Sequence, residues 1–176
     1  MPAVKGIPAA ALMATFLMAA CDGGEGPTGM RVISPAFAAG QPIPERFSCL
    51  GENVPPPIRW KGTPEGTAEL AVVVEDRDAP EGTFVHWIMV GIDPGTTRIE
   101  SDALPPGARV LPGSSDNPTY IGPCPPRGSG THRYSFEVYA LPRRVELAES
   151  SPPAEKARTI RRAASAGGRL EGTFRG

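Results

Sequence analysis

Glycine and proline recur along the whole chain and restrict the secondary structure that it can form. The 176 residues include 21 glycines and 22 prolines, about twice the usual combined share of about 12%. Proline removes a backbone donor and glycine costs conformational entropy, so breaks this frequent exclude a helical bundle. The glycines follow no Gly-X-Y period, which excludes collagen, and strongly apolar runs lie between the Gly/Pro clusters. The pattern predicts one β-rich domain with many turns.

The N-terminus has the pattern of an export signal. Lys5 precedes an uncharged apolar run over residues 7–20, which is shorter than the roughly 20 residues of a membrane-spanning helix. Small residues lead to Cys21, and a Gly-rich polar stretch follows it, which resembles a bacterial lipoprotein signal whose cysteine becomes lipidated. Ordinary cleavage or an uncleaved anchor is the alternative. We therefore expect a lipid-anchored protein of the bacterial cell envelope with three parts: a signal peptide (1–20), a lipid-attached flexible tether (21–30) and a folded domain (31–176).

Two cysteines remain if Cys21 carries lipid. Cys49 and Cys124 lie 75 residues apart, and in an exported chain two leftover thiols tend to pair. Sequence does not show whether their Cα atoms come within bonding distance. A disulfide between them is therefore one possibility and a free pair the other.

The charge of the chain excludes one class of partner. A formal net charge of −1 offers no electrostatic reason to bind nucleic acid. Lys and Arg are in excess over residues 152–176. We interpret this excess as the solvated face of a helix, with contact to anionic lipid as the alternative.

Short apolar runs between turn signals predict the strands. The runs around Val73 and Ile88 are β-branched and nearly continuous, which indicates strands buried on both faces. A period of two within the second run places Phe84, His86, Ile88 and Val90 on one face. The predicted strands cover residues 30–33, 58–60, 69–75, 84–91, 133–141 and 170–174.

One window favours a helix. Residues 152–166 combine early prolines and charged residues with helical periodicity. Ser151 is the expected cap, and Gly167 and Gly168 are expected to end the helix. The chain therefore predicts a mainly antiparallel β domain with a C-terminal helix.

Polar side chains suited to a small anion lie at or near the ends of predicted strands. Asp76 follows the first buried strand, His86 lies inside the next, and His132 precedes the 133–141 strand. Residues 122–130 contain three prolines and three glycines, which stiffen the loop and permit close backbone approach. Such a loop beside His and Tyr donors predicts a neutral cradle for an anion.

The same residues have other interpretations. His86 is equally consistent with a hydrogen-bonded core histidine, and Asp76 with a turn. A zinc site from His86, His132, an Asp and Cys124 lacks a recognised ligand spacing. A Cys124–His132 nucleophile pair lacks an orienting third group, and no nucleophile elbow for a Ser–His–Asp hydrolase is present. We therefore expect no catalytic residue, no metal and no cofactor.

Five segments, in order from about Ile33 to Phe174, carry a family resemblance. They are Cys49-Leu50-Gly51-Glu52-Asn53 with Pro56-Pro57, then Asp76-Arg77-Asp78-Ala79-Pro80, Phe84-Val85-His86-Trp87, Tyr120-Ile121-Gly122-Pro123-Cys124-Pro125-Pro126 with Gly130-Thr131-His132-Arg133-Tyr134, and Leu170-Glu171-Gly172-Thr173-Phe174. Together they resemble the phosphatidylethanolamine-binding protein family, in its bacterial Raf-kinase-inhibitor-like branch.

The resemblance implies a mainly β fold, a β-sandwich with a large central antiparallel sheet, a smaller sheet and a C-terminal helix. It also implies a non-enzymatic pocket for a phosphate-type anion or phospholipid head group. A pocket that docks a partner protein, as in a protease or kinase inhibitor, is the alternative. Where the family usually has proline between two aspartates this chain has Arg77, which either adds a cation at the mouth or points away. The implied ligand-binding residues are Asp76, His86, Pro125, His132 and Tyr134, with Cys124 and Tyr120 beside them.

Overall fold

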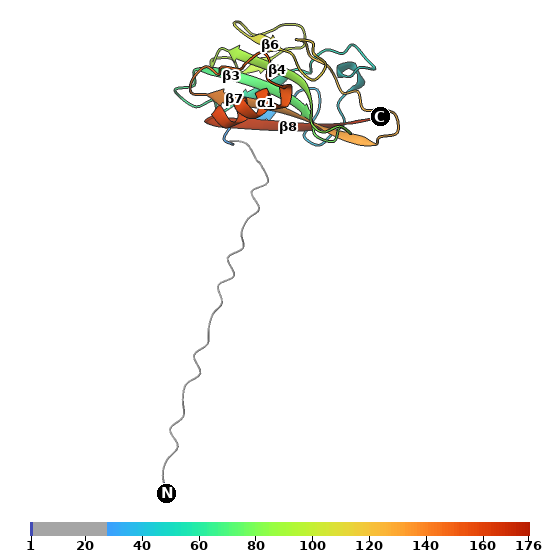
Figure 1. Cartoon of the computed structure of the whole chain (residues 1–176), viewed down its shortest axis with the longest axis horizontal. Helices are drawn as coiled ribbons and strands as arrows, with labels where there is room; N and C mark the ends of the chain where they lie inside the picture. The colour runs from blue at the N-terminus through green and yellow to red at the C-terminus, as the bar shows by residue number, and fades with distance from the viewer. Residues whose placement is uncertain (2–27) are drawn as a thin grey trace.

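Two antiparallel sheets of unequal size and one helix form the described part of the chain (Figure 1). This computed structural model describes Met1 and residues 28–176. The predicted signal peptide beyond Met1, Cys21 and most of the predicted tether therefore lie outside the described residues. The elements are β1 (Arg31–Ile33), the 3-10 helix η1 (Glu45–Phe47), β2 (Ile58–Lys61), β3 (Glu69–Asp76), β4 (Phe84–Ile92), β5 (Arg98–Ile99), β6 (Arg109–Leu111), β7 (Thr131–Leu141), α1 (Pro153–Ala163) and β8 (Ala166–Arg175).

The large sheet has the strand order β6-β4-β3-β7-β8, and the small sheet has the order β1-β2-β5. All eight residues of β3 are buried, as its unbroken apolar run predicts for a central strand. One core cluster lies between the two sheets and includes Trp60, Leu70 and Phe136. A second cluster lies between the other face of the large sheet and α1, which crosses that sheet in Figure 1. The predicted sandwich with a C-terminal helix is confirmed.

The helix ends earlier than predicted. It stops at Ala163, and Gly167 and Gly168 belong to β8 instead of ending the helix. Gly168 is needed for close packing, because a Cβ there would collide with the carbonyl oxygen of Met30. The predicted cap is also wrong: Pro152 occupies the N-cap position, and no side chain makes a capping hydrogen bond.

A β-bulge in β4 changes which side chains share a face. Val74 of β3 pairs with Trp87, but the next residue, Glu75, pairs with Val85. His86 lies between these partners and is the extra residue of the bulged strand. The ladder therefore leaves the His86 backbone free to bond elsewhere.

The predicted single face of β4 is wrong for this reason. Phe84 and His86 line a cavity at the end of the sheet, whereas Ile88 and Val90 pack in the cluster beside α1. One inserted residue reverses the alternation of every side chain beyond it. Simple period-two reasoning has no means of locating such an insertion.

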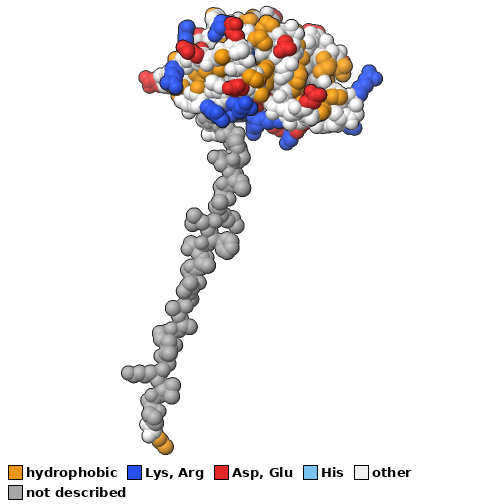
Figure 2. Space-filling view, in the orientation of Figure 1, with side chains coloured by type: hydrophobic (Ala, Val, Ile, Leu, Met, Phe, Trp, Pro, Cys, Tyr) orange, Lys and Arg blue, Asp and Glu red, His pale blue; other side chains and the backbone are white. Residues whose placement is uncertain are grey.

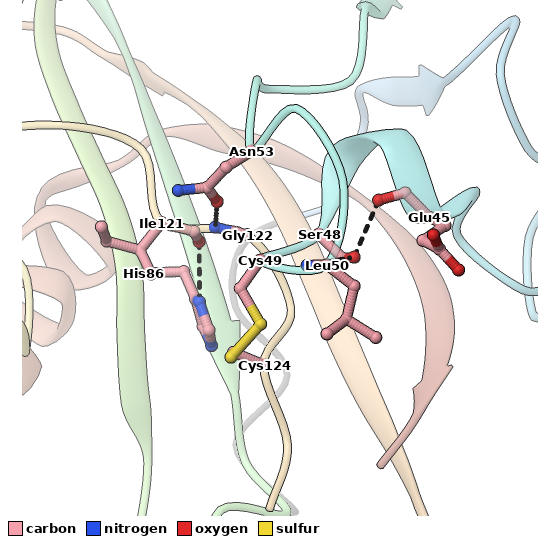
Figure 3. Close-up of a disulfide and its surroundings, with 9 residues drawn as sticks. All are labelled: Glu45, Ser48, Cys49, Leu50, Asn53, His86, Ile121, Gly122 and Cys124. Carbon is pink, nitrogen blue, oxygen red and sulfur yellow. Dashed lines mark hydrogen bonds between the residues drawn. A yellow bond between two sulfur atoms is a disulfide. The ribbon is translucent and has the colours of Figure 1, made fainter.

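The structure joins Cys49 and Cys124 in a disulfide, with their Cα atoms 5.4 Å apart (Figure 3). This bond ties the loop after η1 to the Pro-rich loop before β7 and so resolves the pairing that the sequence left open. Among the described residues, no helix has the length and apolarity that a bilayer crossing requires.

Candidate functional site

A cavity of about 500 Å³ opens where β3 ends and where β4 and β7 begin. Its rim comes from the loop that joins β3 to β4 and from the Pro-rich loop before β7. Six of the seven predicted ligand-binding residues line it. The lining is Asp76, Ala79, Pro80, Glu81, Gly82, Thr83, Phe84, His86, Ser114, Ile121, Cys124, Pro125, Pro126, His132 and Tyr134.

Tyr120 is the seventh predicted residue, and it lies elsewhere. It lines a neighbouring cavity with Trp87, whose ring meets it edge-on at 5.6 Å between centroids. Its buried hydroxyl donates to the carbonyl of Phe47 at 3.0 Å, and burial raises the pKa of this phenol. Tyr120 therefore holds η1 against the sheet, and the structure gives no contact between it and the main cavity.

His86 presents a lone pair at its free ring nitrogen. Its Nδ1 lies 2.8 Å from the carbonyl oxygen of Ile121, an atom that only accepts, so Nδ1 carries the proton. Burial lowers the pKa of His86 below its usual value, and this effect outweighs the hydrogen bond to Ile121. The ring is therefore neutral in the absence of ligand at neutral pH, and Nε2 is an acceptor. The backbone carbonyl freed by the bulge accepts from the amide of Ile121 at 3.2 Å.

His132 has both ring nitrogens engaged. Nδ1 lies 2.7 Å from Oδ2 of Asp76, and Nε2 lies 2.9 Å from the hydroxyl of Ser129. The same hydroxyl lies 2.7 Å from the carbonyl of Pro126, which only accepts. Because the Ser129 hydroxyl donates to Pro126, both ring nitrogens of His132 are occupied by groups of the domain itself.

This line of groups differs from a hydrolase triad. In a triad the serine hydroxyl donates to the histidine, whereas the Ser129 hydroxyl has its proton directed to Pro126. Ser129 was not among the predicted site residues. Its place three residues before His132, in Gly128-Ser129-Gly130, is the signal that links the two.

Tyr134 places a free donor inside the cavity. The residue is 0% exposed, and its hydroxyl has no hydrogen-bond partner among the described residues. Burial raises the pKa of the phenol, and the neighbouring Asp76 carboxylate raises it further. The hydroxyl therefore keeps its proton across the physiological range, and the Asp76 carboxylate beside it is a potential acceptor.

The lining of the cavity contains no Lys or Arg. Arg77 bonds to Glu75 and Glu137 at 3.2 and 3.4 Å, so of its two predicted positions the one away from the mouth is correct. Arg133 forms two side-chain bonds to Asp78, which hold the pKa of that carboxyl at about 2. The cavity lining therefore carries the carboxylates of Asp76 and Glu81 and no Lys or Arg side chain.

The Pro-rich wall is positioned by a segment far away in sequence (Figure 3). The Asn53 side-chain oxygen accepts from the amide of Gly122 at 2.8 Å, and Asn53 adopts a left-handed φ of 57°. A Cβ on Gly122 would collide with the carbonyl of Phe47, so this close approach needs glycine. Asn53 and the disulfide are positioning groups. From the sequence, Asn53 was identified only as part of a family motif, with no role assigned to it at the site.

Fold and site together define a class: a two-sheet β protein with a polar cavity at the mouth of its central strands. A family model described as "Phosphatidylethanolamine-binding protein" matches residues 33–175. The chain belongs to the phosphatidylethanolamine-binding protein family.

Relatives agree with this membership. The chain is 46% identical over 147 residues to a Mycobacterium tuberculosis protein named "Putative lipoprotein LppC", covering 84% of this chain and 73% of that protein. It is also 46% identical over 154 residues to the UPF0098 protein Rv1910c of the same species, covering 86% and 74%.

Solved structures are similar over almost the same span. The Escherichia coli protein YbcL, described as a member of the mammalian family, has a TM-score of 0.76 and 27% identity, covering 84% of this chain and 98% of that one. The homologue CT736 of Chlamydia trachomatis has a TM-score of 0.74 and 29% identity, covering 84% and 97%. A carboxypeptidase Y inhibitor solved with its cognate proteinase shares the fold at 17% identity and a TM-score of 0.57, covering 82% and 83%.

Proposed function

We propose that the cavity binds a phosphate-type group, either of a free phosphorylated solute or of a phospholipid head group, without turning it over. The observation that carries the proposal is the Tyr134 hydroxyl, which is buried in the cavity lining without a partner among the described residues. A buried donor of this kind is costly unless something accepts from it. A phosphate oxygen is an acceptor that suits it.

His86 supplies the second polar contact. In the neutral ring, Nε2 accepts the hydrogen of a singly protonated phosphate. In the protonated ring, the same nitrogen donates to a dianion. Each case places one proton between His86 and the ligand, so binding of a dianion takes up a proton.

The charges of the lining favour a zwitterion over a bare anion. Glu81 and Asp76 line the cavity, and no Lys or Arg does. An anion alone meets no full countercharge there, which limits its affinity. In phosphoethanolamine, the phosphate reaches Tyr134 and His86 while the ammonium has the carboxylate of Glu81 at the rim.

We also propose that the protein carrying this cavity lies in the cell envelope. The similar mycobacterial protein is named a lipoprotein, and in this chain Cys21 follows an apolar run with small residues before it. We propose cleavage after residue 20 and lipid attachment at Cys21. Metabolic labelling with a fatty acid, lost on Cys21→Ala, tests this part separately from ligand binding.

A second candidate is a docking site for a partner protein. The fold neighbour solved in complex with its cognate proteinase supports this alternative, although at 17% identity that likeness concerns the fold alone. A partner captured from envelope extracts and lost on substitution of His86 would favour it.

Calorimetric titration of the full chain tests the main proposal. The probes are phosphoethanolamine, inorganic phosphate and ethanolamine, and we expect phosphoethanolamine to bind more tightly than either of its halves. The His86→Asn variant keeps a donor near the Ile121 carbonyl but has no titrating ring, and we expect weaker binding. Absence of heat with all three probes, or wild-type affinity in His86→Asn, overturns the proposal.

A further inference from the structure

The outward face of the small sheet is basic. Its exposed strand residues are Arg31 of β1, Arg59 and Lys61 of β2 and Arg98 of β5, with Ile33 among them. Alternation along the two longer strands directs Val32 of β1 and Ile58 and Trp60 of β2 inward instead. We call these five outward residues (Arg31, Ile33, Arg59, Lys61 and Arg98) the basic face.

The basic face sets like charges directly opposite each other. The strand register pairs Arg31 with Lys61 and Arg59 with Arg98. Facing cations of this kind destabilise a sheet. Within residues 28–176, the one ion pair here joins Arg98 to Glu100 at 3.1 Å. Three cations are therefore held together without a carboxylate from the described domain, which is an arrangement that an external anionic surface would stabilise.

The basic face is also hollowed and partly apolar. A cavity of about 360 Å³ lies between Arg31, Ile33, Arg59, Trp60 and Lys61. Ile33 is 44% exposed, one of few large apolar side chains that the described domain leaves open to solvent. Cations around an accessible apolar side chain suit the boundary of a bilayer, where head groups lie beside acyl chains.

The basic face lies beside the point where the chain enters the domain. The Met30 amide donates to the carbonyl of Gly167 at 3.0 Å, which fixes the entry, and β1 begins at the next residue. Arg31 follows Cys21 by ten positions, a span of at most about 35 Å when the chain is extended. Figure 2, in the orientation of Figure 1, shows further Lys and Arg side chains on the α1 side of the domain, near the point where the described chain begins.

We propose that the basic face docks on the anionic surface of the membrane that carries the anchor. The inference rests on the lipid attachment at Cys21 in the proposed function. The anchor would hold the face within reach of the lipid head groups, and each Lys or Arg near that surface would gain attraction that salt screens. The ligand cavity lies at the other end of the large sheet: β8 pairs Gly167 with the far end of β7, and Phe174 with His132. Docking would therefore leave the cavity mouth accessible.

Vesicle sedimentation of the full chain tests the docking. Cys21→Ala removes the lipid site, so binding then reports the protein surface. The vesicles are phosphatidylcholine alone or with about a third phosphatidylglycerol, at about 50 and about 500 mM salt. The test variant adds Arg59→Glu and Lys61→Glu. The matched control adds Arg143→Glu and Arg144→Glu, the same charge change at exposed residues outside the face.

We expect the parent chain to bind anionic vesicles at least about tenfold better than neutral ones at low salt, and to lose the difference at high salt. The test variant should lose most of the preference and the control should keep it within about twofold. All three chains share residues 7–20, so insertion of that apolar run cancels between them. Equal binding to both vesicles by the parent, or equal losses in both variants, overturns the proposal. Phosphoethanolamine titration of the test variant should be unchanged, which separates this failure from that of the ligand site.

Discussion

Replacing Tyr134 by phenylalanine separates a ligand-binding role from a structural one. The change deletes one buried hydroxyl and leaves the ring in place. That hydroxyl has no partner among the described residues, and a buried unsatisfied group costs about 1–3 kcal/mol. The ligand-free Tyr134→Phe protein should therefore keep its free energy of unfolding or gain about 1 kcal/mol.

Ligand binding should move in the opposite direction. A hydrogen bond to a charged group contributes about 1.5–3 kcal/mol, and each 1.4 kcal/mol corresponds to roughly tenfold in affinity. Tyr134→Phe should therefore weaken phosphoethanolamine binding by about ten- to a hundredfold. Substitution of a residue needed only for the fold would not combine an unchanged or higher free energy of unfolding with weaker ligand binding.

Tyr139→Phe is the matched control on the opposite face of the sheet. Its hydroxyl donates to Glu137 at 2.6 Å and accepts from Arg161 at 2.9 Å. Its loss should destabilise the fold by about 1–3 kcal/mol and leave ligand affinity unchanged. Urea unfolding followed by tryptophan fluorescence and calorimetric titration measure the two quantities. The reasoning is refuted if Tyr134→Phe is destabilised like the control, or if it binds phosphoethanolamine as tightly as the parent.

Four further predictions concern protons in binding, protons in unfolding, the disulfide and a buried ion pair. Sulfate keeps the same charge over this pH range, so its affinity reports the protonation of His86. The affinity should rise about tenfold for each pH unit as pH falls from about 7 toward the lowered pKa of His86. His86→Asn should remove this pH dependence. Without ligand, the same group should make unfolding easier as pH falls below about 6.5, because the unfolded ring takes up its proton first; thermal melts at several pH values measure this. Changing Cys49 and Cys124 to alanine opens a loop of 75 residues and should cost about 4 kcal/mol in urea unfolding. Arg161→Met removes a bond of 2.8 Å to the buried Glu137 and should cost about 3–5 kcal/mol, partly restored by Glu137→Gln; stability in the single variant equal to wild type would contradict this.

The long central strands could be predicted because local and tertiary preferences agree there. The run around Val73 is β-branched, ends at a Gly/Pro turn, and fills a strand buried on both faces. The same agreement places Asp76 at one strand end and His132 near the start of another. The short strands β5 and β6 were missed, since two or three residues show no periodicity and pair only because neighbours present an open edge.

The end of α1 shows how packing overrides local signals. Two consecutive glycines normally end a helix, yet Gly167 and Gly168 lie within β8. The deciding contact is the backbone of Met30, more than a hundred residues away. A requirement for space and a requirement for a turn look identical in the sequence.

The donor and acceptor roles of the site residues could be assigned only from the structure. The sequence identified His86 and His132 as candidates and treated both as hydrogen-bond donors to a ligand. The tertiary contacts distinguish them, because Ser129 and Asp76 occupy both nitrogens of His132, while His86 keeps one nitrogen free. The bulge that aims His86 at the cavity is a property of strand register and has no local sequence signature.

The sequence by itself determined the class of the chain: frequent Gly and Pro between β-branched runs favour strands joined by stiff turns over a helical bundle. Its motifs also identified six of the residues that line the cavity. Tertiary structure decided what those residues do. Burial decides that His86 is neutral, the geometry leaves the Tyr134 hydroxyl without a hydrogen bond among the described residues, and partners on the opposite face remove Arg77 from the mouth. Each outcome depends on segments that are far apart in sequence but close together in space, because hydrogen bonding and desolvation act only over short distances.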